Sequence, residues 1–433
     1  MTKRFSLVVS VLLMVGLLLS STGLTFAADD SITVMTVWGG QELKAFKTMT
    51  ERFEEKTGIE VQYESTRDLP TLLTTRVEGG NPPDIVHLSG MGLLKEHASE
   101  GNLIDLKTVF DMEEFKQNYS QKWLDLAEYE DGMYGLFISA DVKSLVWYNP
   151  QQFEKKGYEV PETWDELKEL TDKMIANGDT PWAIGLESGS ASGWPGTDWI
   201  EDIMLRTAGP EVYDKWVDHD IPWTDERVKR AFEIFGEIAH NSKRVYGGPT
   251  NVVSTNFGDS VNALFTDPPR AYLHRQASFI TSFIKDNNPN LEAGKDYDFF
   301  PFPSIDQENG TPMLGAADML GMMNDTPATR KYMRYLASDE AQEIWIKELG
   351  KIGTNKNIDP EVYPNDLTRK MAEKLRNAET FRFDGSDSMP SSIGSGSFWK
   401  EILNYVRGQD LDQVLQRIEQ DADEAYDSGK ATD

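Results

Sequence analysis

The sequence has 433 residues, of which 39% are hydrophobic and 11% aromatic, with 43 basic against 72 acidic side chains and a formal net charge of −29 at pH 7. This composition excludes a disordered chain, and the negative charge argues against nucleic acid and anionic lipid as partners. Cysteine is absent, which excludes disulfides, thiolate metal sites and a lipid-bearing cysteine. A chain of this length exceeds one hydrophobic core, so two domains are expected.

Residues 1–27 have the pattern of a secretory signal peptide. Two basic residues precede a mostly apolar run from Phe5 to Leu19, and Thr25-Phe26-Ala27 then offers a small-x-small cleavage site. Such a segment directs export and is then removed, so we expect the mature chain to be an exported, soluble protein. The apolar run is short for a membrane span, and no later stretch is long and apolar enough to be one. We therefore expect a free periplasmic protein without a lipid anchor.

Strands and helices are expected to alternate at the start of the mature chain. Strands are predicted at 31–38, 59–65 and 84–90, and helices at 41–58 and around 72–77. This alternation predicts an α/β fold with a parallel sheet covered on both faces. Ligands of such sheets bind beyond the carboxyl ends of the strands.

A second structural unit is expected to follow a strand that ends near Tyr148. The pattern Thr163-x-x-Glu166 is a capping box and predicts a helix start. From this helix the chain is predicted to be mainly helical up to about 283. An extended segment over 297–305 and a strand over 312–323 follow. The rest is predicted to be helical, over 329–350 and then to the end except at 384–397.

Signatures of enzymes are weak in this sequence. Residues 189–193, GSASG, have alanine where a nucleophile elbow needs serine. The five histidines lack the i, i+4 spacing of a metal pair, and the acidic loops lack the ligand spacing of a calcium loop. No cofactor, metal site or catalytic residue is therefore predicted, although a carboxylate pair for glycoside hydrolysis stays open among the many acids.

Aromatic residues next to carboxylates stand out instead, above all in the segment SGWPGTDWIED at 192–202. A sugar ring has apolar faces and a polar rim, so its binding site needs aromatic plates and short, fixed polar groups. Candidate plates are Trp38, Trp194 and Trp199, and candidate hydrogen-bonding groups are Arg67, Asp68, Asp141, Asp198 and Asp318. We predict that 192–202 is largely a loop in which Trp194 stacks on ligand, whereas Trp199 belongs either to this wall or to the core.

Several segments resemble the extracellular solute-binding proteins of bacterial ABC sugar importers. The family pattern is carried by 32–64, by 79–106 (GGNPPDIVHLSGMGLLKEHASEGNLIDL) and by 148–167. The segments 193–216, 272–280 (YLHRQASFI) and 383–399 (FDGSDSMPSSIGSGSFW) are most similar to the α-glucoside-binding branch.

The resemblance implies a type II periplasmic-binding-protein fold, with two parallel-sheet lobes joined by a hinge. The N-terminal lobe would comprise 28–140 and 300–348, and the C-terminal lobe 141–299 and 349–433. The residues implied to bind ligand are Trp38, Gly39, Gln41, Thr66, Arg67, Asp68, Ser89, Gly90, Asp141, Lys143, Trp194, Gly196, Thr197, Asp198, His274, Gln276, Asp318, Asp384, Ser386 and Asp387. Relatives often carry Gly-Gly-Gly-Asp where this chain has Gly-Ala-Ala-Asp at 315–318, a departure that hinders the approach of a ligand to the backbone.

The function implied by the resemblance is binding without catalysis. A monomeric periplasmic protein would hold an α-glucoside between its lobes and deliver it to the membrane subunits of an ABC permease. Two alternatives stay open from the sequence. One is a binder of a glucosylated compatible solute such as glucosylglycerol, and the other is a secreted glycoside hydrolase.

Overall fold

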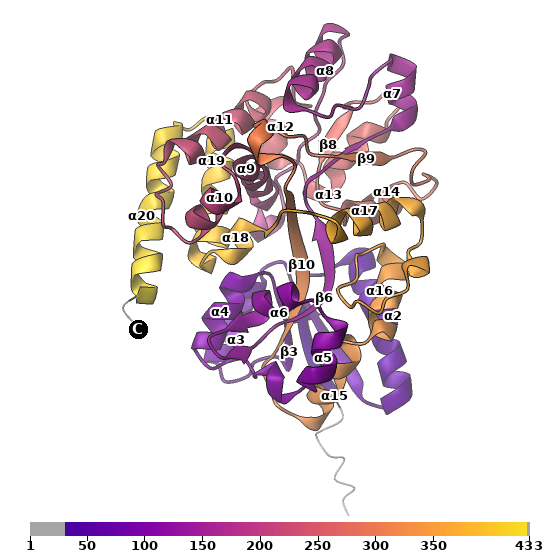
Figure 1. Ribbon diagram of the computed structural model, residues 1–433, viewed down its shortest axis with the longest axis vertical. Coiled ribbons are helices and arrows are strands. Elements are labelled where there is room, and N and C mark those ends of the chain that lie inside the picture. Colours follow the sequence, from indigo (N-terminus) through magenta and orange to yellow (C-terminus); the bar gives the residue numbers. More distant parts are fainter. Residues whose placement is uncertain (1–30, 431–433) are drawn as a thin grey trace, which may run out of the picture.

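The computed structural model describes residues 31–430, which form two lobes stacked along the long axis of the molecule (Figure 1). Strands β6 (Leu136–Val142) and β10 (Met313–Met322) run between the lower and the upper lobe. The two-lobed α/β architecture expected from the sequence is therefore confirmed. The predicted signal peptide, 1–27, lies outside the described residues.

The lower lobe is built on a six-stranded sheet. Its order is β11-β10-β3-β1-β2, with β6 also paired to β10. The first strands along the chain, β1 (Ser31–Thr36), β2 (Glu60–Ser65) and β3 (Ile85–Leu88), pair in parallel as predicted. In contrast, β10 runs antiparallel to β3 and β6, and β11 (Phe381–Phe383) runs parallel to β10. The returning strand β10 thus makes this sheet mixed.

Helices pack on this sheet through apolar faces that recur with the period of a helix. In α2 (Gly40–Thr57), Phe46, Met49 and Phe53 are buried, and Gly58 ends the helix with a left-handed φ of 73°. The other helices of this lobe are α3 (Leu69–Glu78), α4 (Met91–Ser99), α5 (Met112–Asn118), α6 (Gln121–Ala127), α15 (Pro327–Leu336) and α16 (Asp339–Leu349).

The last two helices occupy the range that the sequence predicts as one helix, 329–350. The chain breaks at Ser338, whose side chain accepts a hydrogen bond from the Ala341 amide and starts α16. A serine that caps the second helix is thus the signal that separates the two.

The sheet of the upper lobe differs from the prediction. Its three strands, in the order β8-β7-β9, are β8 (Leu273–Arg275), β7 (Leu145–Tyr148) and β9 (Asp298–Pro301), and both pairings are antiparallel. The prediction of two parallel-sheet lobes is therefore wrong for this lobe. Helices lie between β7 and β8 and between β8 and β9, as in a parallel sheet, but β8 and β9 both run antiparallel to β7.

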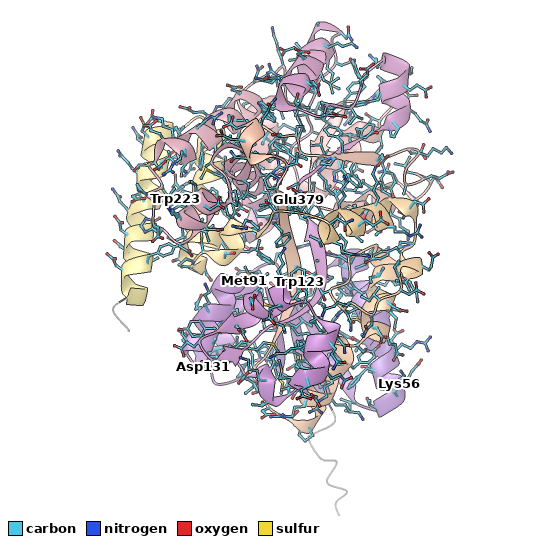
Figure 2. The ribbon with its side chains drawn as sticks, in the orientation of Figure 1. Lys56, Met91, Trp123, Asp131, Trp223 and Glu379 are labelled. Atoms are coloured by element: carbon cyan, nitrogen blue, oxygen red, sulfur yellow. The ribbon has the colours of Figure 1, made fainter. Side chains whose placement is uncertain are left out.

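Helices make up most of the upper lobe. They are α7 (Pro150–Lys156), α8 (Trp164–Ala176), α9 (Trp194–Thr207), α10 (Pro210–Val217), α11 (Glu226–Ala239), α12 (Gly248–Ser254), α13 (Phe257–Ser260), α14 (Ile280–Asn287), α17 (Asp366–Arg376), α18 (Gly385–Ser388), α19 (Trp399–Val406) and α20 (Leu411–Lys430). Trp223 lies in this lobe (Figure 2) and packs edge-on against Trp216 and Phe398. A π-helical segment, 392–398, leads into α19.

Three segments connect the lobes. Besides β6 and β10, residues near Ile352 cross beside Ala140, with which Ile352 forms an isolated antiparallel bridge. Apolar contacts continue across the junction, since Val261 and Ile284 belong to the same buried cluster as β1. Within residues 31–430, no helix combines the length and the hydrophobicity that a bilayer span requires.

Candidate functional site

A cavity of about 180 Å³ lies between the lobes, where β6 and β10 cross from one to the other. The predicted ligand-binding residues that line this cavity are Trp38, Arg67, Ser89, Asp141, Lys143, Trp194, Asp198, Asp318, Asp384, Ser386 and Asp387. They come from strand ends and helix starts of the lower lobe, from β6 and β10, and from α9 and α18 of the upper lobe. Both lobes therefore contribute to the site, as the resemblance implies.

The lobes touch beside the cavity. Gly90, at the start of α4, lies so close to the Asp387 backbone that a Cβ there would overlap it. Near by, the Ser391 hydroxyl donates to Glu96 Oε2 at 2.9 Å. Gly90 therefore acts through close packing of α4 on α18, and only glycine fits at this contact.

One wall of the cavity is aromatic. Trp194 is half-buried, and its ring centroid lies 5.1 Å from that of Phe257 and 5.8 Å from that of Phe279. Trp399 lines the same cavity, and its buried indole Nε1 has no hydrogen-bond partner among residues 31–430. The wall therefore offers ring faces for the apolar side of a ligand and one unused N–H donor.

The segment 192–202 is mostly helical, so the prediction of a loop is wrong. Helix α9 begins at Trp194 and has Pro195 in its first turn, where the missing N–H costs nothing. Gly193 precedes it with a φ of 116°, and a Cβ at Gly193 would overlap the Trp399 backbone. The N-cap residue of α9 is Gly193, which has no side chain to accept a capping hydrogen bond. The start of the helix therefore lacks the serine or aspartate that usually identifies it in a sequence.

The other two candidate tryptophans differ from Trp194. Trp199 is 1% exposed and packs against Trp182, Phe235 and Phe302, so it belongs to the core. Trp38 lines the cavity but is only 2% exposed. Its Nε1 donates to Asp318 Oδ1 at 3.1 Å, so its polar atom orients a carboxylate.

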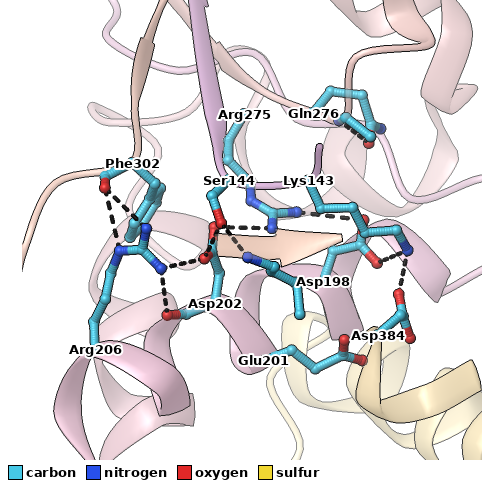
Figure 3. Close-up of polar contacts among 12 residues, drawn as sticks. Lys143, Ser144, Asp198, Glu201, Asp202, Arg206, Arg275, Gln276, Phe302 and Asp384 are labelled. Atoms are coloured by element: carbon cyan, nitrogen blue, oxygen red, sulfur yellow. Dashed lines mark hydrogen bonds and ion pairs between the residues drawn. The ribbon is translucent and has the colours of Figure 1, made fainter. Parts of the chain in front are cut away.

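A lysine sits at the centre of the carboxylates of the upper lobe (Figure 3). Lys143 Nζ lies 2.9 Å from Asp198 Oδ1 and also pairs with Asp384. The Asp384 carboxylate in turn accepts from the Ser386 hydroxyl at 2.8 Å and from the Asp387 amide at 2.9 Å. This cluster places charged groups with fixed orientations at the cavity wall.

A second row of charges lies behind the first and holds α9 in place (Figure 3). Arg275 bridges Asp198 at 3.3 Å and Asp202 at 3.0 Å. Asp202 also pairs with Arg206, whose guanidinium donates to the Phe302 carbonyl. Because these groups are almost fully buried, every charge in the row needs its partner.

Asp198, Glu201 and Asp384 bring carboxylate oxygens within 4.8 Å of one another, as a metal site would. The Lys143 ammonium pairs with two of them, and Glu201 accepts from two backbone amides of α18 at 3.0 and 3.1 Å. The ammonium thus supplies the positive charge that a metal ion would bring.

A second lysine organises the carboxylates on the lower side of the cavity. Lys351 Nζ lies 2.9 Å from Asp141 Oδ2, 3.0 Å from Asp318 Oδ2 and 3.7 Å from Glu42 Oε1. Asp318 also contacts His87 Nε2 at 3.3 Å. Three carboxylates therefore share one buried ammonium.

The two clusters carry more negative than positive charge, and burial shifts their protonation. Burial raises the pKa of Asp198 to about 6 against the attraction of Lys143. Burial likewise raises the pKa of Glu42 and Asp387 above their usual range. For Asp318, burial acts in the same direction, but the Lys351 ammonium and the His87 hydrogen bond outweigh it and hold the pKa below its usual range. The site thus combines fixed carboxylates with acidic groups that carry protons more easily than in water.

Nine predicted residues do not line this cavity; besides Gly90 they are Gly39, Gln41, Thr66, Asp68, Gly196, Thr197, His274 and Gln276. Gly39 and Gln41 line an adjoining pocket. Asp68 is exposed just before α3, where its amide donates to Thr66 Oγ1 at 3.1 Å.

The other four lie behind the site, in the upper lobe. Gly196 faces Ile402, and the Thr197 hydroxyl donates to the Trp194 carbonyl at 3.0 Å. His274 and Gln276 are buried at and just beyond β8. These residues support the wall rather than form it.

Sequence reasoning did not select several residues that line the cavity, among them Glu42, His87, Phe257, Phe279, Phe283, Lys351 and Trp399. Glu42 directly follows the selected Gln41, and His87 lies on β3 two residues before Ser89, which follows that strand. Trp399 ends the segment FDGSDSMPSSIGSGSFW. The phenylalanines and Lys351 carry no local signal, because distant parts of the chain bring them to the cavity.

His274 predicts a pH-dependent stability. Its Nδ1 lies 2.9 Å from the Ala183 carbonyl, and burial lowers its pKa from 6.5 to about 4. The unfolded chain therefore takes up this proton first as the pH falls, so the stabilisation is complete above about pH 6.5 and is lost towards about pH 4. Between about pH 7.5 and pH 5, His274 should cost the wild type about 2 kcal/mol of unfolding free energy.

Urea unfolding of wild type and His274→Gln at the two pH values measures this contribution. The variant should lack the pH-dependent contribution of His274. The wild type alone should lose that contribution as the pH falls, so the stabilities of the two proteins should converge. Parallel losses in both proteins would contradict a neutral, buried His274.

Comparison with known proteins identifies the family to which this chain is similar. The sequence profile of the bacterial extracellular solute-binding proteins matches residues 39–343. An osmoprotective compounds-binding protein, GgtB, from Synechocystis sp. is 47% identical over 388 residues, which cover 90% of this chain and 91% of the relative. An α-glucosides-binding periplasmic protein, AglE, from Rhizobium meliloti is 42% identical over 414 residues, which cover 93% and 88%.

Solved structures share the fold at low sequence identity. A chitin oligosaccharide binding protein matches with a TM-score of 0.80 and 19% identity, covering 92% of this chain and 100% of that one. Maltose-bound MalE3 of T. maritima matches with a TM-score of 0.72 and 18% identity, covering 91% and 99%. These matches confirm the bilobal, type II solute-binding fold.

Proposed function

Since this chain belongs to the bacterial extracellular solute-binding proteins, we propose that it binds an α-glucoside between its lobes and delivers it to the permease of an ABC importer. Members of this family bind sugars and other solutes and are not enzymes. The alternative of a secreted glycoside hydrolase is therefore wrong.

The observation that carries the proposal is the composition of the interlobe cavity. Trp194, Phe257 and Phe279 form an aromatic wall, and the two lysine-centred clusters present carboxylates beside it. Sugars need this combination, because their rings have apolar faces and hydroxyl rims. The names of the two relatives support an α-glucoside or, as the second candidate, a glucosylated compatible solute such as glucosylglycerol.

Delivery requires that the bound form differs from the free form. In our proposal the lobes hinge about β6, β10 and the segment near Ile352, and ligand favours the closed form because only that form contacts it from both sides. The permease then recognises closed, loaded monomers in the periplasm. We propose lobes of 28–140 with 300–348 and of 141–299 with 349–433, with two exceptions: β9 keeps Pro301 in the upper lobe, and β11 pairs with β10 in the sheet of the lower lobe.

Isothermal titration calorimetry with maltose, trehalose, sucrose, glucosylglycerol and unrelated sugars tests the proposal. We expect saturable binding of at least one α-glucoside and no release of glucose after long incubation. Failure to bind any compound with an α-glucosyl unit would overturn it.

Replacing Trp194 with alanine should weaken ligand binding by about 1–3 kcal/mol, because one aromatic plate is removed. This loss corresponds to a Kd that is about 5- to 150-fold higher. Tyr426→Ala is the matched control, since Tyr426 is also a half-buried aromatic of the upper lobe but lies on α20, away from the cavity. An unchanged Kd in Trp194→Ala would assign this indole a purely structural role.

A further inference from the structure

The cavity between the lobes adjoins a second pocket of about 340 Å³. The two share four lining residues, Glu42, Arg67, Phe257 and Phe283. We call the cavity beside Trp194 the inner compartment and this second pocket the outer compartment. The shared residues place the two compartments side by side, so a ligand longer than one ring has a second pocket next to the first.

Both lobes build the outer compartment. Gln41 on α2 and Asp286 on α14 line this compartment from opposite lobes. The Arg67 guanidinium lies 5.6 Å from the centroid of the Phe257 ring, and the Ser190 hydroxyl donates to the Arg67 carbonyl at 3.2 Å. Like the inner compartment, the outer one is complete only while the lobes are in contact.

The lining of the outer compartment suits a hydroxylated group. Phe257 and Phe283 supply apolar surface, and Gln41, Ser282 and Asp286 supply neutral and anionic hydrogen-bonding groups. Amide, hydroxyl and carboxylate groups beside aromatic rings match the hydroxyls and C–H faces of a polyol or a sugar. Among residues 31–430, Arg67 alone contributes a positively charged side chain to this lining, so a strongly anionic ligand group is disfavoured.

The size of the inner compartment also favours a ligand that occupies both compartments. At about 180 Å³, it lies below the roughly 300–1,000 Å³ of typical small-molecule sites, so it suits one ring better than two. We propose that the outer compartment is a second subsite, which binds the hydroxylated aglycone of a glucoside whose glucosyl ring occupies the inner compartment. This inference rests on the proposed function and adds which part of the ligand sets specificity.

A variant that fills the outer compartment tests the inference. Ser282 lines this compartment from α14 but does not line the inner one. In Ser282→Trp, the Kd of the best-binding disaccharide should rise at least tenfold, while that of methyl α-glucoside should stay within twofold of the wild-type value. Lys285→Trp, an exposed position on the same helix outside the lining, is the matched control and should change neither Kd.

The paired variant Gln41→Ala/Asp286→Ala separates the subsite from the contact between the lobes. Loss of a subsite should raise the Kd of the disaccharide or of glucosylglycerol at least fivefold and spare methyl α-glucoside. Equal losses for all three ligands would mean that these side chains only help closure, and this result would overturn the inference. A larger loss for glucosylglycerol than for the disaccharide would identify the aglycone as a polyol, and the reverse would identify it as a sugar.

The outcomes distinguish the inference from the proposed function. Wild-type protein that binds none of the α-glucosides would refute the proposed function itself. Wild-type protein that binds the disaccharide, together with an unchanged Kd in Ser282→Trp, would refute only the second subsite. Melting temperatures and circular dichroism of each variant establish that the fold is intact.

Discussion

Lys143→Met should lower the free energy of unfolding by about 3–5 kcal/mol, because it leaves buried carboxylates without their counter-charge. Lys143 is 6% exposed, and Asp198 and Asp384, its two ion-pair partners, are 0% and 1% exposed. Burial alone lowers the pKa of Lys143, but both carboxylates outweigh it and raise that pKa well above its usual value. The ammonium is therefore held in its charged form. Urea unfolding followed by tryptophan fluorescence and by far-UV circular dichroism measures the loss.

Two control variants test whether the loss comes from the buried charge of Lys143. Lys295→Met removes an exposed lysine that pairs with Glu292 at 3.1 Å, and it should cost less than about 1 kcal/mol. Lys143→Met/Asp384→Asn should recover part of the loss, because Asp198 keeps Arg275 at 3.3 Å. A loss below about 1 kcal/mol in the single variant would contradict a buried cluster whose carboxylates depend on the Lys143 charge.

Local patterns in the sequence were sufficient for the first three strands of the lower lobe and for α2. Alternating apolar residues in β1 and β2 and a 3.6-residue period in α2 predicted a parallel arrangement, which β1, β2 and β3 adopt. The rule that ligands bind at the carboxyl ends of such strands selected Trp38 and Ser89, and both line the cavity. In this architecture, a sequence that predicts the parallel strands therefore also predicts the edge of the sheet at which the site lies.

The upper lobe was less predictable because its contacts join distant segments. The strands β7, β8 and β9 pair antiparallel across long helical excursions, and short strands give no signal of their direction. His274 came from a family motif, but on β8 it pairs with Trp147 and points into the core, where it contacts the Ala183 carbonyl. A motif located the correct strand without showing which face of it meets the ligand.

Lys351 shows most clearly what local patterns miss. It lies after α16 and close to the third crossing segment, more than 200 residues from Asp141, with which it pairs at 2.9 Å. A single lysine in a helix-to-loop junction has no distinguishing sequence pattern, since most lysines are solvated. Its burial follows only from the arrangement of β6, β10 and α16 around one point.

Lys351→Met should weaken ligand binding by about 2–5 kcal/mol, because Asp141 and Asp318 lose the charge that orients them. The variant should also respond to pH in the direction opposite to that of an ordinary ion pair. Burial already raises the pKa of Asp141 against the attraction of Lys351, so loss of the ammonium should raise the pKa of Asp141 further and should also raise that of Asp318. The folded variant then takes up more protons than the folded wild type, so its stability relative to the wild type should rise as the pH falls from about 7.5 to about 5, while His274 lowers the stability of both proteins equally.

Calorimetric titration and urea unfolding of Lys351→Met and wild type at both pH values measure these effects. Lys347→Met is the matched control, because Lys347 is an exposed lysine on α16 that pairs with Glu343 at 3.1 Å, and it should leave the Kd and its pH dependence unchanged. A stability of Lys351→Met that rises relative to that of the wild type on acidification would show that the lysine keeps buried carboxylates ionised for the ligand. If both proteins instead lost stability in parallel, Asp141 and Asp318 would have to be solvated in the folded protein, and the lower side of the cavity would not be the fixed array of acceptors on which sugar recognition depends.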